Sequence, residues 1–252
     1  MPMKTKPSLA VYNRSFQIRS YELSADQRLT VAMMCNFLQE TASNHADALN
    51  VGFKECLEQG IFWVLSELSV TILSSMPGLY DTVHVKTWPT GFDRYFAYRE
   101  FELVTADAAQ VATASTKWML VNIEAKKPTP VPTWLRERLP LPFFKGSKTA
   151  RYTVQDPVFE KLFRVRFSDL DINLHVNNVK MIEWILESVP DFIKSKHILQ
   201  RMDLAFRAEA RYDQNIVVQS VRKDDSPAIY HHQLSIPQKK QMIATARTEW
   251  KY

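Results

Sequence analysis

The chain repeats itself, and this repeat restricts its fold more than any other feature. The segment VATASTKWM at 111–119 returns as IATARTEWK at 243–251, with five identical positions between the stretches ATASTKW and ATARTEW. A fainter pair relates FQIR at 16–19 to FRVR at 163–166. Similarity between distant segments of one chain is typical of a duplicated structural unit. The sequence therefore predicts two halves with one architecture.

Each half reads as a short strand, a polar connection, one helix and then a run of strands. Apolar residues recur at helical spacing over 29–38 in the first half and over 179–189 in the second, where Pro190 ends the pattern. Alternating strand-like segments follow: IFWVLSELSVTI, TVHVKTWPT, YFAYREFELVT and VATASTKWMLVNI, then MDLAFRAEAR, NIVVQSVRK, IYHHQLSIP and MIATARTEW. One helix with several consecutive strands favours an antiparallel sheet wrapped around the helix. The predicted fold is α+β, a double hotdog.

The domain boundaries follow from the prolines. We expect an N-terminal hotdog domain over 8–127, a proline-rich linker over 128–160 and a C-terminal hotdog domain over 161–252. The linker holds six of the thirteen prolines, which favour an extended path, while TWLRERL within it predicts a short helix. Its length fits a tether between the two sheets.

Composition excludes several classes of protein. The net charge of +5 is spread without a block of like charges, which argues against nucleic-acid binding and fits attraction to an acidic protein or a phosphate-bearing ligand. The five glycines form no phosphate-binding loop. No apolar run approaches the roughly 18 residues that predict a membrane span. With two cysteines and no export or organelle signal at the start, the sequence predicts a cytoplasmic protein.

The stretch SDLDINLHVNN, at 168–178, has a polar residue at every second position. An extended backbone would turn these residues to one side and the aliphatic residues between them to the other, as an anchor. The polar set is Asp169, Asp171, Asn173 and His175, and the aliphatic set is Leu170, Ile172, Leu174 and Val176. Such a row could serve as a metal loop, a catalytic wall or a polar strand face.

Metal-ligand rules argue against the first of these readings. A calcium loop that begins at Asp169 requires Gly at its sixth position and Glu at its twelfth, and these are Leu174 and Lys180. Zinc sites use spaced His and Cys residues, but Cys35 and Cys56 are both far away in sequence. We therefore expect no metal and no cofactor.

Several blocks, in order, resemble the acyl-acyl carrier protein (acyl-ACP) thioesterases, typified by plant plastid enzymes. They are FLQETASNHA at 37–46, VHVKTWPTGFDR at 83–94, STKWMLVN at 115–122 and SDLDINLHVNNVKMIEWILES at 168–188. The resemblance runs from about Tyr21 to Trp250. It implies a double hotdog with an acyl-binding N-terminal half and a catalytic C-terminal half. It also implies hydrolysis of the thioester between a fatty acyl chain and the phosphopantetheine arm of acyl carrier protein.

The same resemblance implies the site residues. By residue-by-residue match they are Asp171, Asn173, His175 and, in LAFRAEAR, Glu209. Either carboxylate could take a proton from water, the amide could orient the carbonyl or the water, and the imidazole could move a proton. Plant members carry Cys after this Glu, but here the position is Ala210. We therefore expect activated water rather than an acyl-enzyme, with Cys35 and Cys56 structural.

Structural interpretations of the same residues stand beside these functional ones. Asp and Asn ahead of a helix are often turn formers and caps, with Asn177 or Asn178 the better candidate for the cap. In a strand, Glu209 would share a face with Arg207 and Arg211 as an exposed ion-pair row. His45 is expected to be structural. The stripe Met33, Met34, Phe37 and Trp63 could line an acyl slot but fits a plain core better.

Three other functions remain open on the sequence. An acyl-CoA thioesterase would use the same chemistry on a smaller donor. A hotdog enoyl hydratase or dehydratase has a similar Asp-x-Asn-Pro-x-His signature, but here the Pro is missing and Asp171 and His175 are four residues apart rather than five. An inactive acyl-binding module would not need all four polar residues. A homodimer is also left open.

Overall fold

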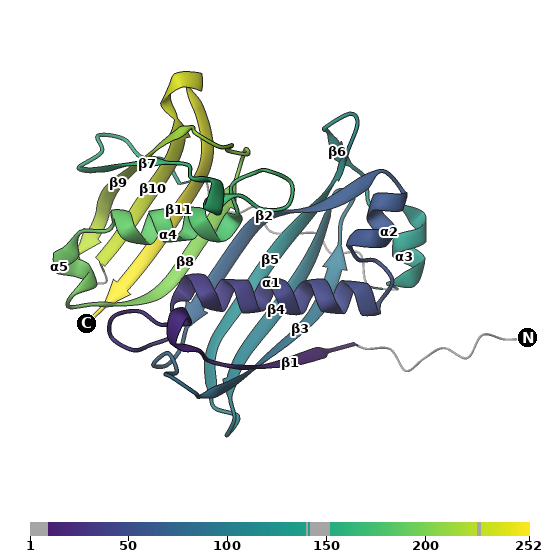
Figure 1. Cartoon of the computed structure of the whole chain (residues 1–252), viewed down its shortest axis with the longest axis horizontal. Helices are drawn as coiled ribbons and strands as arrows, with labels where there is room; N and C mark the ends of the chain where they lie inside the picture. The colour runs from purple at the N-terminus through teal and green to yellow at the C-terminus, as the bar shows by residue number, and fades with distance from the viewer. Residues whose placement is uncertain (1–9, 140, 142–151, 226–227) are drawn as a thin grey trace, which may run out of the picture. The chain divides into compact units, whose positions relative to one another are not determined.

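A computed structural model describes residues 10–139, 141, 152–225 and 228–252 (Figure 1). The chain forms two compact units. The first comprises Met1–Leu29, Asn36–Val64 and Met76–Gly146, and the second comprises Thr30–Cys35, Leu65–Ser75 and Ser147–Tyr252. Two short segments from the first half of the sequence thus belong to the second unit.

The two halves share one order of elements: a strand, a 3-10 turn, a long helix, a short helix and four strands. The first half contains β1 (Tyr12–Gln17), η1 (Ser20–Glu22), α1 (Val31–Ala48), α2 (Phe53–Glu58), β2 (Ile61–Ile72), β3 (Thr82–Phe92), β4 (Phe96–Thr105), β5 (Gln110–Asn122), β6 (Pro128–Thr129) and α3 (Thr133–Arg138). The second contains β7 (Phe159–Arg164), η2 (Phe167–Asp169), α4 (Asn178–Ser188), α5 (Asp191–Lys194), β8 (Ile198–Phe206), β9 (Asn215–Asp225), β10 (Ala228–Ile236), η3 (Pro237–Lys239) and β11 (Gln241–Lys251). In the described part of the chain, β6 and α3 are additions in the first half and η3 is an addition in the second.

Strand order repeats as well. It is β1-β3-β4-β5-β2 in the first half and β7-β9-β10-β11-β8 in the second. Each strand of the second half therefore occupies the place of the strand whose number is lower by six, as β7 does for β1. Pairing along β7-β9-β10-β11-β8 is antiparallel throughout. The predicted double hotdog is confirmed, with α1 and α4 as its two long helices (Figure 1).

The second-half helix begins and ends where local chemistry requires. The side chain of Asn177 accepts a hydrogen bond from the backbone N–H of Val179 at 2.9 Å, which satisfies an otherwise free amide of the first turn. Val189, with extended backbone, ends the helix before Pro190. The predicted cap and stop are therefore both confirmed. In the first half, α1 continues through the polar stretch ETASNHAD, which the apolar spacing alone did not predict.

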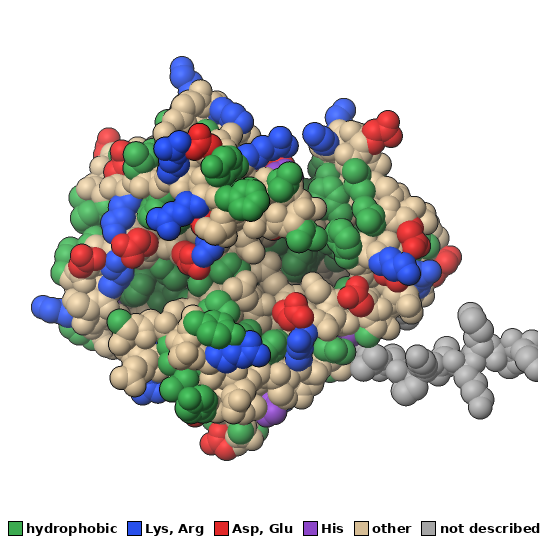
Figure 2. Space-filling view, viewed as in Figure 1, with side chains coloured by type: hydrophobic (Ala, Val, Ile, Leu, Met, Phe, Trp, Pro, Cys, Tyr) green, Lys and Arg blue, Asp and Glu red, His purple; other side chains and the backbone are tan. Residues whose placement is uncertain are grey.

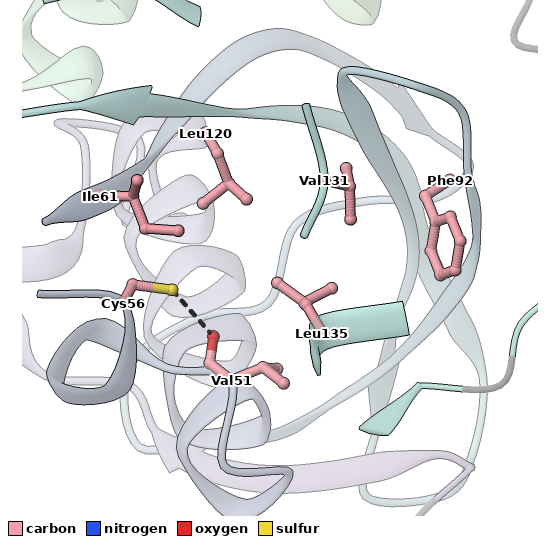
Figure 3. Packing of buried hydrophobic residues seen from close by; sticks show 7 residues of the cluster. All are labelled: Val51, Cys56, Ile61, Phe92, Leu120, Val131 and Leu135. Atoms are coloured by element: carbon pink, nitrogen blue, oxygen red, sulfur yellow. Dashed lines mark hydrogen bonds between the residues drawn. The ribbon is translucent and has the colours of Figure 1, made fainter. Parts of the chain in front are cut away.

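One core cluster of the first unit includes part of the expected linker. Figure 3 shows Val51, Cys56, Ile61, Phe92, Leu120, Val131 and Leu135 packed together. Val131 and Leu135 come from the proline-rich segment, and Leu135 lies on the predicted short helix, observed as α3. Removing a buried leucine of this kind typically costs about 2–5 kcal/mol of stability. Residues 142–151 of the expected linker lie outside the described residues.

Candidate active site

The polar motif folds into a tight reversal rather than an extended strand. Leu170 and Val176 form an isolated antiparallel bridge, and the amide of Asp171 donates to the carbonyl of His175 at 2.7 Å. Leu174 sits at the turn with φ of 61°, in the left-handed region. The expected row of aliphatic anchors is therefore wrong at two positions, because the reversal leaves Ile172 84% and Leu174 64% exposed.

Asp169 has a structural role at the base of this loop. It is buried, with 8% of its surface exposed, and its side chain accepts the backbone N–H of Arg166 at 2.8 Å. Its own carbonyl accepts the N–H of Asn177 at 2.9 Å. A buried carboxylate that receives a backbone amide is satisfied without a ligand. Asp169 thus holds η2 against the start of the helix.

Asp171 uses one carboxylate oxygen to shape the loop. Its Oδ1 accepts the backbone N–H of Asn173 at 2.8 Å and that of His175 at 3.2 Å. This is the turn-forming role expected of Asp in a loop. The side chain of Asn173 is exposed and makes no hydrogen bond to any residue that the structure describes. Its amide is therefore available to a bound molecule.

His175 and Glu209 come together although 34 positions separate them in the sequence. His175 Nε2 lies 2.9 Å from Glu209 Oε2, with side-chain exposures of 21% and 51%. A carboxylate at this distance orients the imidazole and fixes its tautomer. The interpretation of Glu209 as one of an exposed ion-pair row with Arg207 and Arg211 is wrong, since its segment lies beyond the end of β8 and its carboxylate contacts the imidazole of His175.

Glu209 reaches His175 because its strand ends early. The predicted strand MDLAFRAEAR stops at Phe206 in β8, where the amides of Arg207 and Ala208 both turn to the carbonyl of Ile243. The chain then crosses to the motif, and the carbonyl of Ala210 accepts the N–H of Val176 at 2.8 Å. This backbone bond joins the segment of Glu209 to that of His175.

Ala210 itself is fully buried, with none of its surface exposed. It touches no solvent from which a substrate could arrive, and it has no reactive group. The contribution of this position is its carbonyl, as a positioning group. Sequence reasoning missed this role, because a backbone contact between distant segments leaves no residue pattern.

Both thiols are buried, and both have raised pKa values. Cys35 is 1% exposed and Cys56 is fully buried. Burial raises the pKa of Cys35 to about 12. Burial, helped by the charge of Glu55, raises the pKa of Cys56 to about 11. Since the thiolate is the nucleophilic form, the structural role expected for both cysteines fits their surroundings.

His45 and the apolar stripe singled out by the sequence are buried or half-buried. His45 is fully buried, and its Nδ1 lies 2.9 Å from Nη1 of Arg99, in keeping with a structural role. Met34 and Phe37 are also buried. Trp63 is half-buried and donates from Nε1 to the carbonyl of Val51 at 3.0 Å, beside the cluster in Figure 3.

In the described part of the chain, no group of three or more His, Cys, Asp or Glu side chains could hold a metal ion. Among the helices of that same part, none is both long and apolar enough to cross a membrane.

The fold and the site define a class: a hotdog protein in which an imidazole and a carboxylate, those of His175 and Glu209, are in contact beside a loop shaped by Asp171. Family models give the particular family. The model of the acyl-ACP thioesterase N-terminal domain matches residues 9–139, and that of the C-terminal domain matches residues 152–252. The chain belongs to the acyl-ACP thioesterase family.

Individual relatives agree with this assignment. A chloroplastic palmitoyl-acyl carrier protein thioesterase of Gossypium hirsutum is 32% identical over 81% of this chain and 53% of its own length. An acyl-ACP thioesterase structure from Bacteroides thetaiotaomicron matches with a TM-score of 0.85 and 22% identity, over 96% of this chain and 98% of that one. The 12:0-ACP thioesterase of Umbellularia californica gives a TM-score of 0.83 and 24% identity, over 96% and 94%.

These matches differ in how much of each relative they cover. The chain spans about half the length of the Gossypium hirsutum relative, at 53%. Low-identity structural matches of this kind establish the fold alone.

Proposed function

We propose that this protein hydrolyses the thioester of a fatty acyl-acyl carrier protein, releasing the free fatty acid and ending chain elongation. The observation that carries the proposal is the contact of His175 Nε2 with Glu209 Oε2 at 2.9 Å, beside the loop that Asp171 holds. Membership of the acyl-ACP thioesterase family supports the same reaction.

Three side chains act on the reacting groups, and Asp171 shapes the loop that carries two of them. Glu209, half-exposed, takes a proton from a water molecule, whose oxygen attacks the thioester carbon. Asn173 directs its amide N–H to the carbonyl oxygen, where negative charge develops. The carbon–sulfur bond then breaks, and His175 passes the proton from Glu209 to the leaving sulfur. Thiols have a pKa near ~8.5, so this leaving group needs little assistance.

The two units divide the work in this proposal. The second unit carries the loop and Glu209, and the first unit binds the acyl chain on apolar side chains. Water is the nucleophile, because Ala210 has no reactive group and both thiols are buried. The set of groups is sufficient without a metal or cofactor. Cytoplasmic location and a homodimer both stay predictions.

A substrate panel tests the proposal. The protein is incubated with acyl carrier proteins and acyl-CoAs that bear chains of different lengths, and the free fatty acid is measured. We expect release from acyl carrier protein at a higher kcat/KM than from acyl-CoA. Higher kcat/KM on acyl-CoA favours the CoA-specific alternative. Hydration of crotonyl or decenoyl thioesters without release of free acid would refute hydrolysis.

A further inference from the structure

Three loops lie at the same end of the second sheet, and two of them carry the candidate site residues. Arg164 pairs with Asn215, Ser235 with Val217, and Ala244 with Phe206, so the loops that follow β7, β8 and β10 emerge at the same end. These loops cover residues 165–177, 207–214 and 237–240. We call this set of loops, which includes His175 and the half-exposed Glu209, the loop face.

The loop face exposes large apolar side chains. Phe167 is 74% exposed, and its ring packs edge-on against that of Tyr212, which is 58% exposed. Ile172 and Leu174, on the reversal itself, are exposed at 84% and 64%. Such a group of apolar residues beside a reactive site is typical of a surface that another molecule covers.

The same loops carry cations without internal partners. Arg207, Arg211, Lys239 and Lys240 are all exposed, and within the described residues none of their side chains makes an ion pair or hydrogen bond. Figure 2 shows basic and hydrophobic side chains side by side along this upper end of the second unit.

The carboxylates of the loop face are already engaged. Asp169 accepts the amide of Arg166, Asp171 accepts loop amides, and Glu209 contacts His175. The remaining one, Asp213, pairs with Arg164 at 2.5 Å. Counting Arg164 and Arg166, six Arg and Lys side chains stand against four carboxylates, so the loop face carries an excess of positive charge.

We propose that the loop face is the docking surface for the carrier protein, with Arg207, Arg211, Lys239 and Lys240 receiving acidic side chains and the phosphodiester of its pantetheine arm. Phe167 and Tyr212 cover apolar carrier residues. The proposal rests on the proposed function, because it assumes that the thioester comes on a protein. A carrier of acidic surface complements both features, since unlike charges steer association and apolar area at the centre adds affinity.

Two matched double variants test the role of charge. Arg207→Glu/Arg211→Glu changes the loop face, and Lys196→Glu/Lys251→Glu makes the same change in net charge at the opposite end of β8 and β11, where Ile198 pairs with Lys251. Each variant is assayed on an acyl carrier protein and on the same acyl chain attached to pantetheine, which has neither phosphate nor protein.

For the loop-face variant we expect KM for acyl carrier protein to rise by roughly tenfold or more, and salt to raise the wild-type KM in the same direction. We expect kcat/KM on acyl-pantetheine to stay within about twofold of wild type for both variants, since neither pair touches the reacting atoms. An equal rise in KM for the control pair would overturn the proposal in favour of diffuse charge attraction. An unchanged KM in the loop-face variant would overturn it too.

A binding measurement separates docking from catalysis. Carrier protein with a non-hydrolysable thioether-linked acyl chain is titrated into wild type and into Phe167→Ser/Tyr212→Ser. Weaker binding by the variant supports docking even if wild type hydrolyses no thioester, in which case the proposed function alone fails. Unchanged binding, with a dimer of the wild type dissociating in the variant, would instead make the loop face an interface between two copies.

Discussion

The loop at 24–28 in the first unit and the loop at 171–175 in the second are two copies of one backbone. Leu23 bridges Leu29 as Leu170 bridges Val176, with each position 147 residues before its counterpart. Gln27 has φ of 59° and Leu174 has φ of 61°, so both loops reverse direction at the same position. The backbone of the loop is therefore a property of the duplicated fold and not of the candidate chemistry.

The supports beneath the two loops are also alike. The carboxylate of Glu22 accepts the amide of Arg19 at 2.8 Å, as Asp169 accepts that of Arg166. The amide of Leu29 bonds to the carbonyl of Pro77 where Val176 bonds to Ala210. Met76 thus takes the position of Glu209.

The side chains differ where the backbones agree. The first loop has Ser24, Asp26 and Arg28 in place of Asp171, Asn173 and His175. The side chain of Arg28 donates to the carbonyl of Met76 at 3.3 Å, whereas the imidazole of His175 contacts the carboxylate of Glu209. The second copy thus pairs an imidazole with a carboxylate, and the first has no such pair at the matching positions. Four side-chain positions on a shared backbone therefore distinguish the candidate site from its counterpart.

The strongest test exchanges the loops. We replace residues 171–175 by the residues of 24–28, giving Asp171→Ser, Ile172→Ala, Asn173→Asp, Leu174→Gln and His175→Arg. Because both sequences already form this reversal, we expect the circular dichroism spectrum to be retained and kcat to fall by roughly 10³-fold or more. A folded variant with more than about a tenth of wild-type kcat would place the chemistry elsewhere.

A smaller loss is expected from the partner carboxylate alone. Glu209→Gln keeps the size of the side chain but removes its charge, and we expect kcat to fall by about 10²-fold, the usual scale for a general base. Glu183→Gln, an exposed helix carboxylate paired with Lys180, is the control and should leave kcat unchanged. Near-normal activity of Glu209→Gln would return Glu209 to a surface role.

The buried imidazole of His232 in the second unit predicts that stability depends on pH. His232 is fully buried between Ser220, at 2.8 Å, and Thr248, at 2.9 Å, and burial, with a smaller effect of His231, lowers its pKa to about 3. In the unfolded chain this pKa is about 6.5. Between these two pKa values the unfolded state binds more protons than the folded state. The free energy of unfolding therefore has its full value above pH ~6.5 and decreases as the pH falls towards 3.

Urea unfolding at pH 7 and pH 5 measures this effect. We expect His232 to account for a loss of about 2 kcal/mol, and His232→Gln to remove that part of the pH dependence. Arg99 is the contrasting base in the first unit, since burial lowers its pKa only to about 10 and it stays charged over this range. An unaltered pH dependence in His232→Gln would show that His232 is not the titrating group.

The smallest effect is expected from the thiols. Cys35→Ala/Cys56→Ala should keep wild-type kcat, apart from a packing loss of about 1 kcal/mol in stability for each buried sulfur. Iodoacetamide should leave the native enzyme active, because the pKa values of about 12 and 11 keep thiolate scarce. An acyl group trapped on either sulfur would contradict the water mechanism.

The sequence by itself determined the duplication, the double hotdog and the helix limits at Asn177 and Pro190. These features depend on local periodicity and on chain chemistry within a few residues, which a sequence displays directly. The choice of Asp171, Asn173, His175 and Glu209 also came from the sequence, but through resemblance to a family rather than from spacing.

Only the tertiary structure decided how those residues meet. The alternation in SDLDINLHVNN suggested a strand, but the chain reverses at Leu174, and this places Ile172 and Leu174 in solvent. Likewise, the pattern of LAFRAEAR continues past Phe206 although β8 does not, and that early end brings Glu209 to His175. The approach of Glu209 depends on backbone hydrogen bonds between distant segments, such as Val176 to Ala210, and any side chain can accompany such a bond. The reversal depends on bonds within the loop, which the alternation of polar and apolar residues did not reveal.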